Sequence, residues 1–238
     1  MAELQSANVT KFDVSRASQY ETESRIALAG YEACHELAAC ILTASLGSGI
    51  PARVLVAGAG GIGHEITTLA RLEPQWTFTA VDPSQPMLEL CLSRIAAAGL
   101  TKKTDAILGF VDDVALDPPF DAATLIGVLH HLPGEEAKLT ILRAIAARLQ
   151  VGAPLILAAN YRPYPSQPLL LRAWKERWRL HGATPDQVQE RFGNIAKAAD
   201  PPVSEHAVTD LLARAGFEPP LRFFASLFWG AWIARREA

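Results

Sequence analysis

The sequence has little of what marks a metal protein, a membrane protein or a disulfide-stabilised protein. Only three cysteines occur in 238 residues, at positions 34, 40 and 91. Their number is odd and their spacing is not that of a zinc site, so we expect reduced thiols and no metal. No apolar run approaches the roughly 20 residues that cross a bilayer, and no stretch resembles a signal peptide. We therefore expect a cytoplasmic protein with no membrane partner.

Charge of one sign is scarce as well. The formal net charge is −3, and no basic cluster stands out that would follow a phosphate backbone, so we expect no nucleic-acid partner. Half of the residues are hydrophobic and a fifth are charged, which is ordinary for a globular protein with a substantial core. No internal repeat or low-complexity tract is evident. The informative features are therefore local motifs.

Glycine is concentrated in one such motif. Residues 53–64 read Arg-Val-Leu-Val-Ala-Gly-Ala-Gly-Gly-Ile-Gly-His, a short apolar run that enters a glycine-rich turn and then a segment that can begin a helix. The first glycine permits the turn, the second lets a ligand approach the backbone, and the third lets helix and strand pack closely. The helix start offers unpaired N–H groups and a positive dipole end. We predict a nucleoside-containing cofactor at Gly58, Ala59, Gly60 and Gly63.

Strand-like and helix-like segments alternate around this loop. Strands are expected at 54–57, 76–81, 106–111, 120–126 and 154–159, and helices at 22–46, 64–72, 84–98 and 135–149. This alternation predicts a doubly wound, Rossmann-like α/β fold with a mostly parallel sheet. The strands carry few charges, as expected when helices cover both faces of a sheet.

The alternation stops after Asn160. Two helices are expected at 169–180 and 185–198, inside an inserted segment, 161–204, that could form a lid. A helix at 205–215 and two strands near 221–225 and 227–234 follow, and their short link favours an antiparallel hairpin at the sheet edge. We predict one domain, 1–238, with an N-terminal helical cover, 1–46, and seven strands including an antiparallel C-terminal strand.

Asp82 supports the cofactor prediction. It ends the second expected strand, where a carboxylate can accept hydrogen bonds from both ribose hydroxyls. The same residue could instead cap the helix that follows Pro83. A glycine loop with an acid at this distance fits either a nicotinamide dinucleotide or S-adenosylmethionine, and this pattern alone leaves both open.

Later segments favour the second cofactor. Residues 81–88 (Val-Asp-Pro-Ser-Gln-Pro-Met-Leu), 119–124 (Pro-Phe-Asp-Ala-Ala-Thr) and 128–133 (Val-Leu-His-His-Leu-Pro) together resemble the class I S-adenosylmethionine-dependent methyltransferases. The resemblance is strongest over residues 50–160. It implies S-adenosylmethionine as cofactor. Further cofactor-binding candidates in or near these segments are Pro83, Met87, Asp112, Asp113 and Val128.

Within that superfamily the chain is most similar to the branch that contains carboxy-S-adenosylmethionine synthase. The shared features are Gly30-Tyr31, the inserted helices with Arg191, Ala215-Gly216-Phe217 and the aromatic segment 223–229. In that family the matching tyrosine and arginine help to hold the amino-acid end of the cofactor or its carboxylates. Tyr31 and Arg191 are therefore cofactor-binding candidates by resemblance.

One position departs from the family pattern. Many members have an acid two residues before the first glycine, where it helps to hold the cofactor's ammonium group, and this chain has Val56. Without a carboxylate nearby, the amine has less reason to stay protonated, and a neutral amine is a nucleophile. An alternative reaction is therefore ring closure of the cofactor to azetidine-2-carboxylate with release of methylthioadenosine. Carboxy-S-adenosylmethionine synthesis is a further alternative.

Candidate catalytic residues lie mostly where strands end. His131, next to His130, follows the fourth strand and is a candidate base if the acceptor must lose a proton. Asn160 and Tyr161 end the fifth strand, and Asn194 lies on the second inserted helix. Tyr20 belongs to a segment that resembles the N-terminal cover of small-molecule methyltransferases, where it could face a sulfonium or hydrogen-bond the reacting group.

The favoured function is methyl transfer from S-adenosylmethionine to a small molecule. Non-methylating use of the same cofactor is the first alternative, and a cofactor-binding protein without catalysis is the second. The expected partner is a small-molecule substrate. A homodimer formed through the inserted helices is also open.

Overall fold

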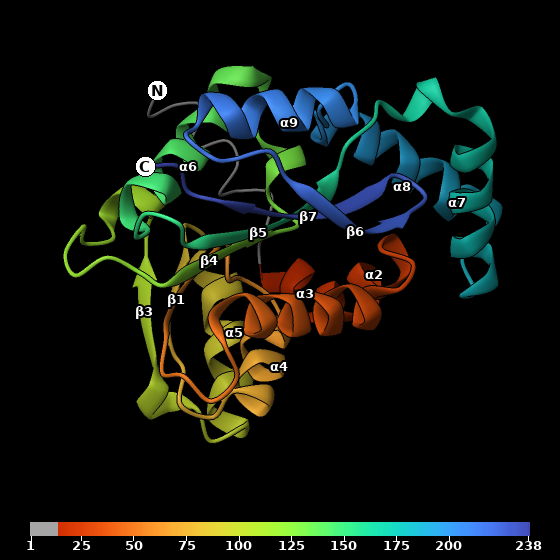
Figure 1. Ribbon diagram of the computed structural model, residues 1–238. Helices are drawn as coiled ribbons and strands as arrows, with labels where there is room; N and C mark the ends of the chain where they lie inside the picture. Colours follow the sequence, from red (N-terminus) through yellow and green to blue (C-terminus); the bar gives the residue numbers. More distant parts are fainter. Residues whose placement is uncertain (1–13) are drawn as a thin grey trace.

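The computed structural model describes the backbone of residues 14–238 and the side chains of residues 21–238. One seven-stranded sheet runs through the molecule in the order β3-β2-β1-β4-β5-β7-β6 (Figure 1). The strands are β1 (Arg53–Ala57), β2 (Thr77–Asp82), β3 (Thr104–Leu108), β4 (Ala122–Ile126), β5 (Pro154–Asn160), β6 (Leu221–Ser226) and β7 (Trp229–Arg235). The first five are parallel, and β7 runs antiparallel to both β5 and β6. The predicted fold and its C-terminal hairpin are confirmed.

Helices cover both faces of the sheet. They are α2 (Val14–Ala27), α3 (Tyr31–Leu46), α4 (His64–Leu72), α5 (Gln85–Ala97), α6 (Gly134–Arg148), α7 (Pro168–Leu180), α8 (Pro185–Ala198) and α9 (Glu205–Arg214). Along β1, Val54 and Val56 pack with α3, α4 and α5, whereas Leu55 and Ala57 pack with α6 and α9. This alternation follows from the two-residue period of a strand. Because both faces are covered, the central strands are apolar throughout.

The prediction of one helix at 22–46 is wrong, because this segment forms two helices, α2 and α3, that are separated by a break at Gly30. Gly30 has a φ of 85°, in the left-handed region, and α2 and α3 meet at 84°. The apolar spacing continues across the break, so periodicity alone does not reveal it. A glycine inside a helical pattern was the available signal.

The third strand also lies earlier than expected, at Thr104–Leu108 instead of 106–111. Gly109 donates its N–H to the Asp82 carbonyl at the end of the ladder. Phe110 then starts a short 3₁₀ turn, η2 (Val111–Asp113), because the Asp113 carboxylate accepts the Phe110 N–H at 2.7 Å. The local side-chain bond thus ends the strand where the apolar pattern continues.

The inserted helices pack against the end of α2 (Figure 1). Trp174 of α7 donates its indole N–H to the Ala27 carbonyl at 3.0 Å, and Arg177 donates to the Ile26 carbonyl at 2.9 Å. The last carbonyls of a helix have no partner within the helix, so these side chains satisfy them. As a result α2, α7 and α8 lie together beyond the carboxyl ends of the central strands.

None of the described helices is by itself long and apolar enough to cross a bilayer. Glu21–Ala27 and Tyr31–Leu46 reach that length and apolar composition only when they are taken together across their 84° bend.

Substitution of Gly30 tests the origin of the break between α2 and α3. Gly30→Ala should destabilise the protein by about 1–2 kcal/mol, because an L-residue in the left-handed conformation clashes with its own backbone. The added Cβ would also lie 3.3 Å from the Phe224 ring. Gly193→Ala in α8 is the matched control, since its Cβ would meet nothing within 4 Å and it should stabilise by up to about 1 kcal/mol. Urea denaturation followed by circular dichroism measures both, and equal midpoints would contradict this explanation.

Candidate functional site

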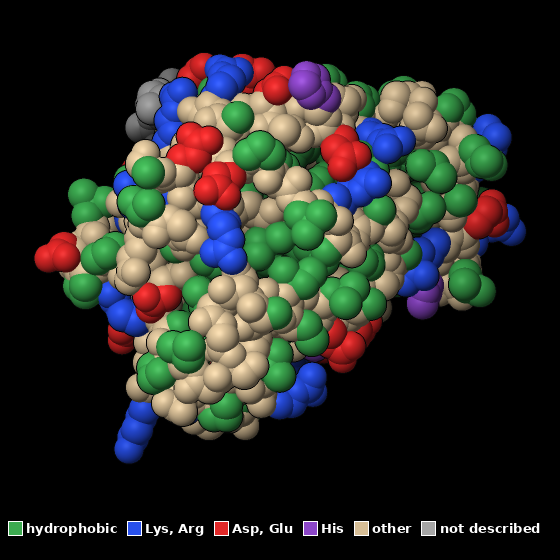
Figure 2. Space-filling model, in the orientation of Figure 1, with side chains coloured by type: hydrophobic (Ala, Val, Ile, Leu, Met, Phe, Trp, Pro, Cys, Tyr) green, Lys and Arg blue, Asp and Glu red, His purple; other side chains and the backbone are tan. Residues whose placement is uncertain are grey.

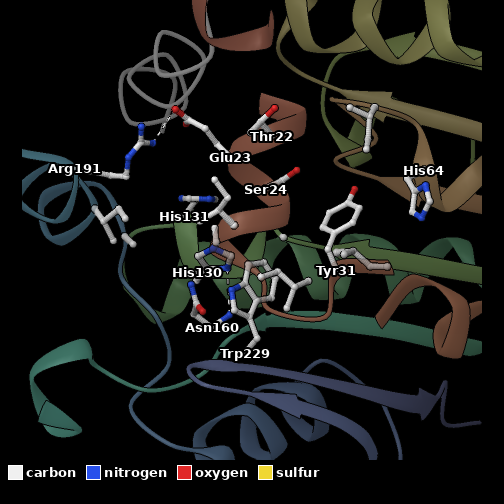
Figure 3. Close-up of a pocket in the computed structure, with 18 of the residues that line it drawn as sticks. Thr22, Glu23, Ser24, Tyr31, His64, His130, His131, Asn160, Arg191 and Trp229 are labelled. Atoms are coloured by element: carbon white, nitrogen blue, oxygen red, sulfur yellow. Dashed lines mark hydrogen bonds and ion pairs between the residues drawn. The ribbon is translucent and has the colours of Figure 1, made fainter. Parts of the chain in front are cut away.

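A cavity of about 980 Å³ lies at the carboxyl ends of β1, β4 and β5, beneath α2, α7 and α8 (Figure 3). The strand order reverses between β1 and β4, and open α/β sheets bind ligands in the crevice at such a switch point. The cavity wall contains these sequence candidates: Tyr31, Gly58, Ala59, Gly60, Gly63, His131, Asn160, Arg191 and Asn194. The fold therefore brings together residues from most of the chain.

The glycine loop is packed so closely that side chains would not fit. A Cβ on Gly58 would lie 2.2 Å from Cγ2 of Val128, and a Cβ on Gly60 would lie 2.5 Å from Oδ2 of Asp82 and 2.6 Å from Cβ of Met87. Atoms at these distances overlap. Gly60 is thus required for packing within the protein, and the loop backbone is left to face the cavity.

Asp82 holds this loop in place. Its Oδ2 accepts the Gly60 N–H at 2.9 Å and its Oδ1 accepts the Ser84 N–H at 2.8 Å. Burial raises the pKa of the Asp82 carboxyl, although these two hydrogen bonds oppose the rise. Each carboxylate oxygen can accept a further bond. Asp82 therefore both caps the segment before α5 and remains able to bind ribose hydroxyls, so the two readings of the sequence are compatible.

The first turn of α4 offers donors at the same crevice. Within residues 14–238, the N–H groups of residues 64–66 have no hydrogen-bond acceptor, and the first helical bond runs from Thr67 to the Gly63 carbonyl. Such a helix start favours an anionic group, through its free N–H groups and its dipole. Together with the closely packed loop and Asp82, these donors fit a nucleoside that also carries a carboxylate.

Glu65 is a candidate that sequence reasoning missed. It lies in the first turn of α4, lines the cavity, and its carboxyl Oε1 accepts the Thr124 hydroxyl from β4. Burial raises the pKa of this carboxyl to about 7. The sequence signal was an acid two residues after the glycine loop, which reads equally well as an ordinary first-turn glutamate.

Three rings form the cavity wall beside Glu65. Tyr31 lies 4.3 Å from His35 and 5.5 Å from His64, measured between ring centroids. His35 contacts the Tyr31 carbonyl through Nδ1 at 2.8 Å. Burial lowers the pKa of His35 to about 4 and also lowers the pKa of His64. Both imidazoles are therefore neutral near pH 7, and this wall carries no histidine cation.

The opposite part of the cavity is formed where β4, β5 and β7 end. His130 lies 4.3 Å from His131 and 5.0 Å from Trp229, and Nδ1 of His130 accepts the Asn160 N–H at 3.4 Å. Burial lowers the pKa of His130 well below its usual value. Asn160 donates its amide N–H to Tyr164 at 3.2 Å. This region presents neutral polar groups and aromatic rings.

Arg191 has a partner of its own at the far end of the cavity. Its Nη1 lies 2.8 Å from Oε1 of Glu23 on α2 (Figure 3). Its guanidinium carbon lies 4.0 Å from the Trp178 ring centroid. The arginine predicted to bind the cofactor thus ties α8 to α2. Asn194, one turn further along α8, is exposed and lines the cavity.

Several other candidates do not line this cavity. Tyr161 is buried on the opposite face of the sheet against Trp232 and accepts from Arg162 and Arg222. Asp113 accepts the Phe110 N–H, and Asp112 is exposed with its Oδ1 3.7 Å from Arg148. Asp82, Met87 and Val128 pack against the glycine loop from the side away from the cavity, and Pro83 directly follows β2. The Tyr20 side chain lies outside the described residues.

Replacement of Glu65 tests its environment through pH. Burial raises its pKa to about 7, above the roughly 4.3 of an exposed glutamate, so the folded protein holds this proton more tightly than the unfolded chain. The stability that this residue contributes therefore falls as pH rises from the pKa of the unfolded chain to the pKa of the folded protein. Glu65→Gln should raise the melting temperature more at about pH 8 than at about pH 5. Thermal unfolding of both proteins across this range measures the difference, and a difference that does not grow with pH would contradict the assignment.

Part of the chain is similar to a known protein family. Residues 56–155 match the family model described as "Methyltransferase domain". This segment runs from Val56 to β5 and includes the glycine loop, Asp82, Glu65 and Thr124. No curated protein sequence matches the chain.

Several solved structures with the same fold are described as methyltransferases. A 1,6-didemethyltoxoflavin-N1-methyltransferase from Burkholderia thailandensis, with bound 1,6-didemethyltoxoflavin and S-adenosylhomocysteine, is 22% identical over 98% of this chain and 90% of its own, with a TM-score of 0.66. Human N-acetylserotonin methyltransferase in complex with S-adenosylmethionine is 15% identical over 95% of this chain and 57% of its own, with a TM-score of 0.64. The chain spans 50% to 67% of the length of four further matching structures. These similarities show that the chain has the α/β fold of these methyltransferases.

Proposed function

We propose that this protein binds S-adenosylmethionine in the cavity and transfers its methyl group to a small-molecule acceptor. The observation that carries the proposal is the crevice between β1 and β4, where the glycine loop, held in place by Asp82 of β2, lies next to the free N–H groups of α4. The family match over residues 56–155 and the bound S-adenosylhomocysteine of the Burkholderia structure support the same cofactor. The specific branch expected from the sequence is not needed for this proposal.

The residues present fit the parts of this cofactor. Asp82 would accept from the ribose hydroxyls, the loop at residues 58–60 would lie against the nucleoside, and the first turn of α4 would bind the carboxylate. When bound, the cofactor supplies an electrophilic methyl group on a sulfonium. The task of the chain is then to orient an acceptor atom in line with that methyl group and to exclude water.

The acceptor would occupy the part of the cavity lined by His130, Asn160 and Trp229. His130 is neutral because burial lowers its pKa well below the usual value. The side-chain oxygen of Asn160, Oδ1, is buried and has no hydrogen-bond partner among the described residues. An N–H or O–H group of the methyl-accepting molecule could donate a hydrogen bond to it. Arg191 is already paired with Glu23. These features favour a neutral, ring-containing acceptor over a strongly charged one.

Incubation with S-adenosylmethionine tests the reaction type. The enzyme with a panel of neutral heteroaromatic acceptors should form S-adenosylhomocysteine and a methylated acceptor, and the enzyme with cofactor alone should form neither. Ring closure to azetidine-2-carboxylate, which the apolar Val56 favours, would instead give methylthioadenosine without any acceptor. Mass spectrometry of both mixtures distinguishes these outcomes. Methylthioadenosine from cofactor alone, faster than in a no-enzyme control, would contradict methyl transfer as the function.

Asp82→Asn tests the cofactor site. The substitution keeps the shape of the side chain but removes its charge and one acceptor oxygen, so S-adenosylhomocysteine should bind at least about tenfold more weakly, as expected when hydrogen bonds to a charged group are lost. Asp105→Asn on β3 is the matched control, because Asp105 is exposed and its removal should leave binding unchanged. Isothermal titration calorimetry measures both, and equal affinities of the two variants would count against the assigned site.

A further inference from the structure

Glu65 reaches into the crevice at the point where the sheet changes direction. Val56 of β1 and Thr124 of β4 are register partners across the switch point. Both side chains therefore point to the same face of the sheet, toward α4. The Glu65 carboxyl crosses from α4 to accept the Thr124 hydroxyl, so an acidic group from a helix binds the residue that pairs with Val56 in the sheet. Glu65 and Val56 both line the cavity.

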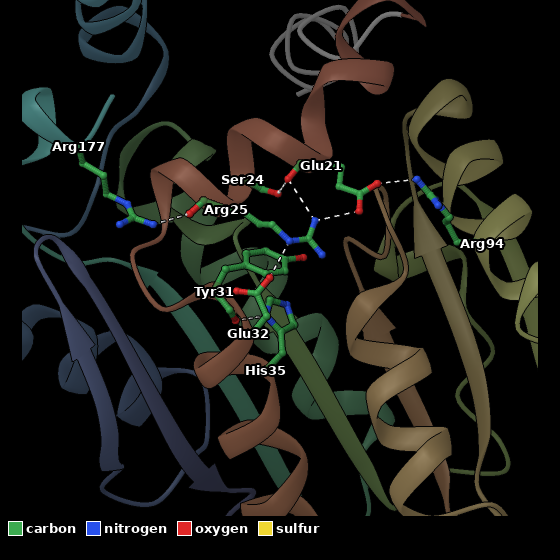
Figure 4. A network of polar contacts seen from close by, with 8 residues as sticks. All are labelled: Glu21, Ser24, Arg25, Tyr31, Glu32, His35, Arg94 and Arg177. Carbon is green, nitrogen blue, oxygen red and sulfur yellow. Dashed lines mark hydrogen bonds and ion pairs between the residues drawn. The ribbon is translucent and has the colours of Figure 1, made fainter. Parts of the chain in front are cut away.

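The Glu65 carboxyl has no cationic partner among the described residues. Burial raises its pKa, and only the Thr124 hydrogen bond opposes the rise. The arginines around the cavity are paired elsewhere. Arg25 binds Glu21 and Glu32 beneath α2 (Figure 4), and Arg191 binds Glu23 (Figure 3). His64, the neighbouring residue, has its pKa lowered by burial and is neutral near pH 7.

An acid in such a place is unfavourable for the protein alone. A desolvated carboxylate without a cation destabilises the fold, and it becomes favourable when a cation enters beside it. A carboxyl that lies in a ligand crevice although it destabilises the fold is a candidate for binding a cationic group of the ligand. That group would occupy the end of the cavity next to the glycine loop.

The neighbouring donors decide which cation fits. The free N–H groups of residues 64–66 favour an anion, and the Glu65 carboxyl, in the same helical turn, favours a cation. An α-amino acid carries a carboxylate and an ammonium on one carbon atom. A single turn of α4 thus presents complementary groups for both charges of an amino-acid end.

We propose that Glu65 binds the α-ammonium group of the cofactor and fixes the direction of its amino-acid end. This proposal rests on the proposed function. Glu65 then takes the place of the acid that the end of β1 lacks at Val56, and the chain retains a charged contact for the amine. Glu65 is a positioning residue, because it contacts the cofactor away from the transferred methyl group.

Two ligands separate this role from a structural one. S-adenosylhomocysteine has the amino-acid end, and methylthioadenosine shares the nucleoside but lacks that end. At about pH 8, where the Glu65 carboxyl with a pKa of about 7 is ionised, Glu65→Gln should bind S-adenosylhomocysteine at least about tenfold more weakly and methylthioadenosine within about twofold of the parent protein. Thr124→Val, which removes the hydrogen bond that the carboxyl accepts within the described part of the chain, should weaken S-adenosylhomocysteine binding by a few fold and spare methylthioadenosine. Glu89→Gln on the exposed face of α5 is the control and should change neither.

Isothermal titration calorimetry of the four proteins with both ligands gives a defined answer. Loss of S-adenosylhomocysteine affinity alone supports the proposal. An unchanged affinity in Glu65→Gln overturns it, as does an equal loss for both ligands, which would show that Glu65 only shapes the loop. Should Glu65→Gln fail to fold, the Thr124→Val protein decides by the same criterion. Failure of the parent protein to bind either ligand would instead refute the proposed function itself.

Discussion

The position of the cofactor loop depends on two backbone hydrogen bonds to one buried carboxylate. Asp82 accepts from Gly60 on one side and from Ser84 on the other, and the loop approaches so closely that a Cβ at Gly60 would overlap Asp82 and Met87. A buried carboxylate needs such donors, and the loop needs a fixed acceptor. Because α4 starts directly after this loop, the same constraint sets where its free N–H groups and Glu65 point.

The charges around the cavity follow a consistent arrangement. Arginines on α2 and α8 are neutralised by glutamates on α2 and α3, which holds the helices over the strand ends. The histidines lining the cavity beside Tyr31 and Trp229 include three whose pKa values are lowered by burial. Glu65 lines the cavity beside the glycine loop and has no cationic partner among the described residues. The cavity therefore has an anionic group at the glycine-loop end and neutral, aromatic walls where an acceptor would bind.

Much of the fold was predictable from local signals. The alternating apolar segments, the glycine loop and Asp82 indicated the sheet, its order of elements and the crevice, because these depend on short-range patterns. The break at Gly30 was missed, since the apolar spacing continues through it. The pairing of Arg191 with Glu23 and the bond between Glu65 and Thr124 join residues 168 and 59 positions apart, and no sequence pattern encodes such contacts. Site residues that act through long-range neighbours therefore required the structure.

A crystal structure with S-adenosylhomocysteine tests the central claim most directly, because it locates both ends of the ligand at once. The account predicts the nucleoside against the loop at residues 58–60, with ribose hydroxyls hydrogen-bonded to Asp82 and the α-amine hydrogen-bonded to Glu65. Density for the nucleoside outside the crevice between β1 and β4 would contradict it. An amino-acid end directed away from the first turn of α4 would contradict the role given to Glu65.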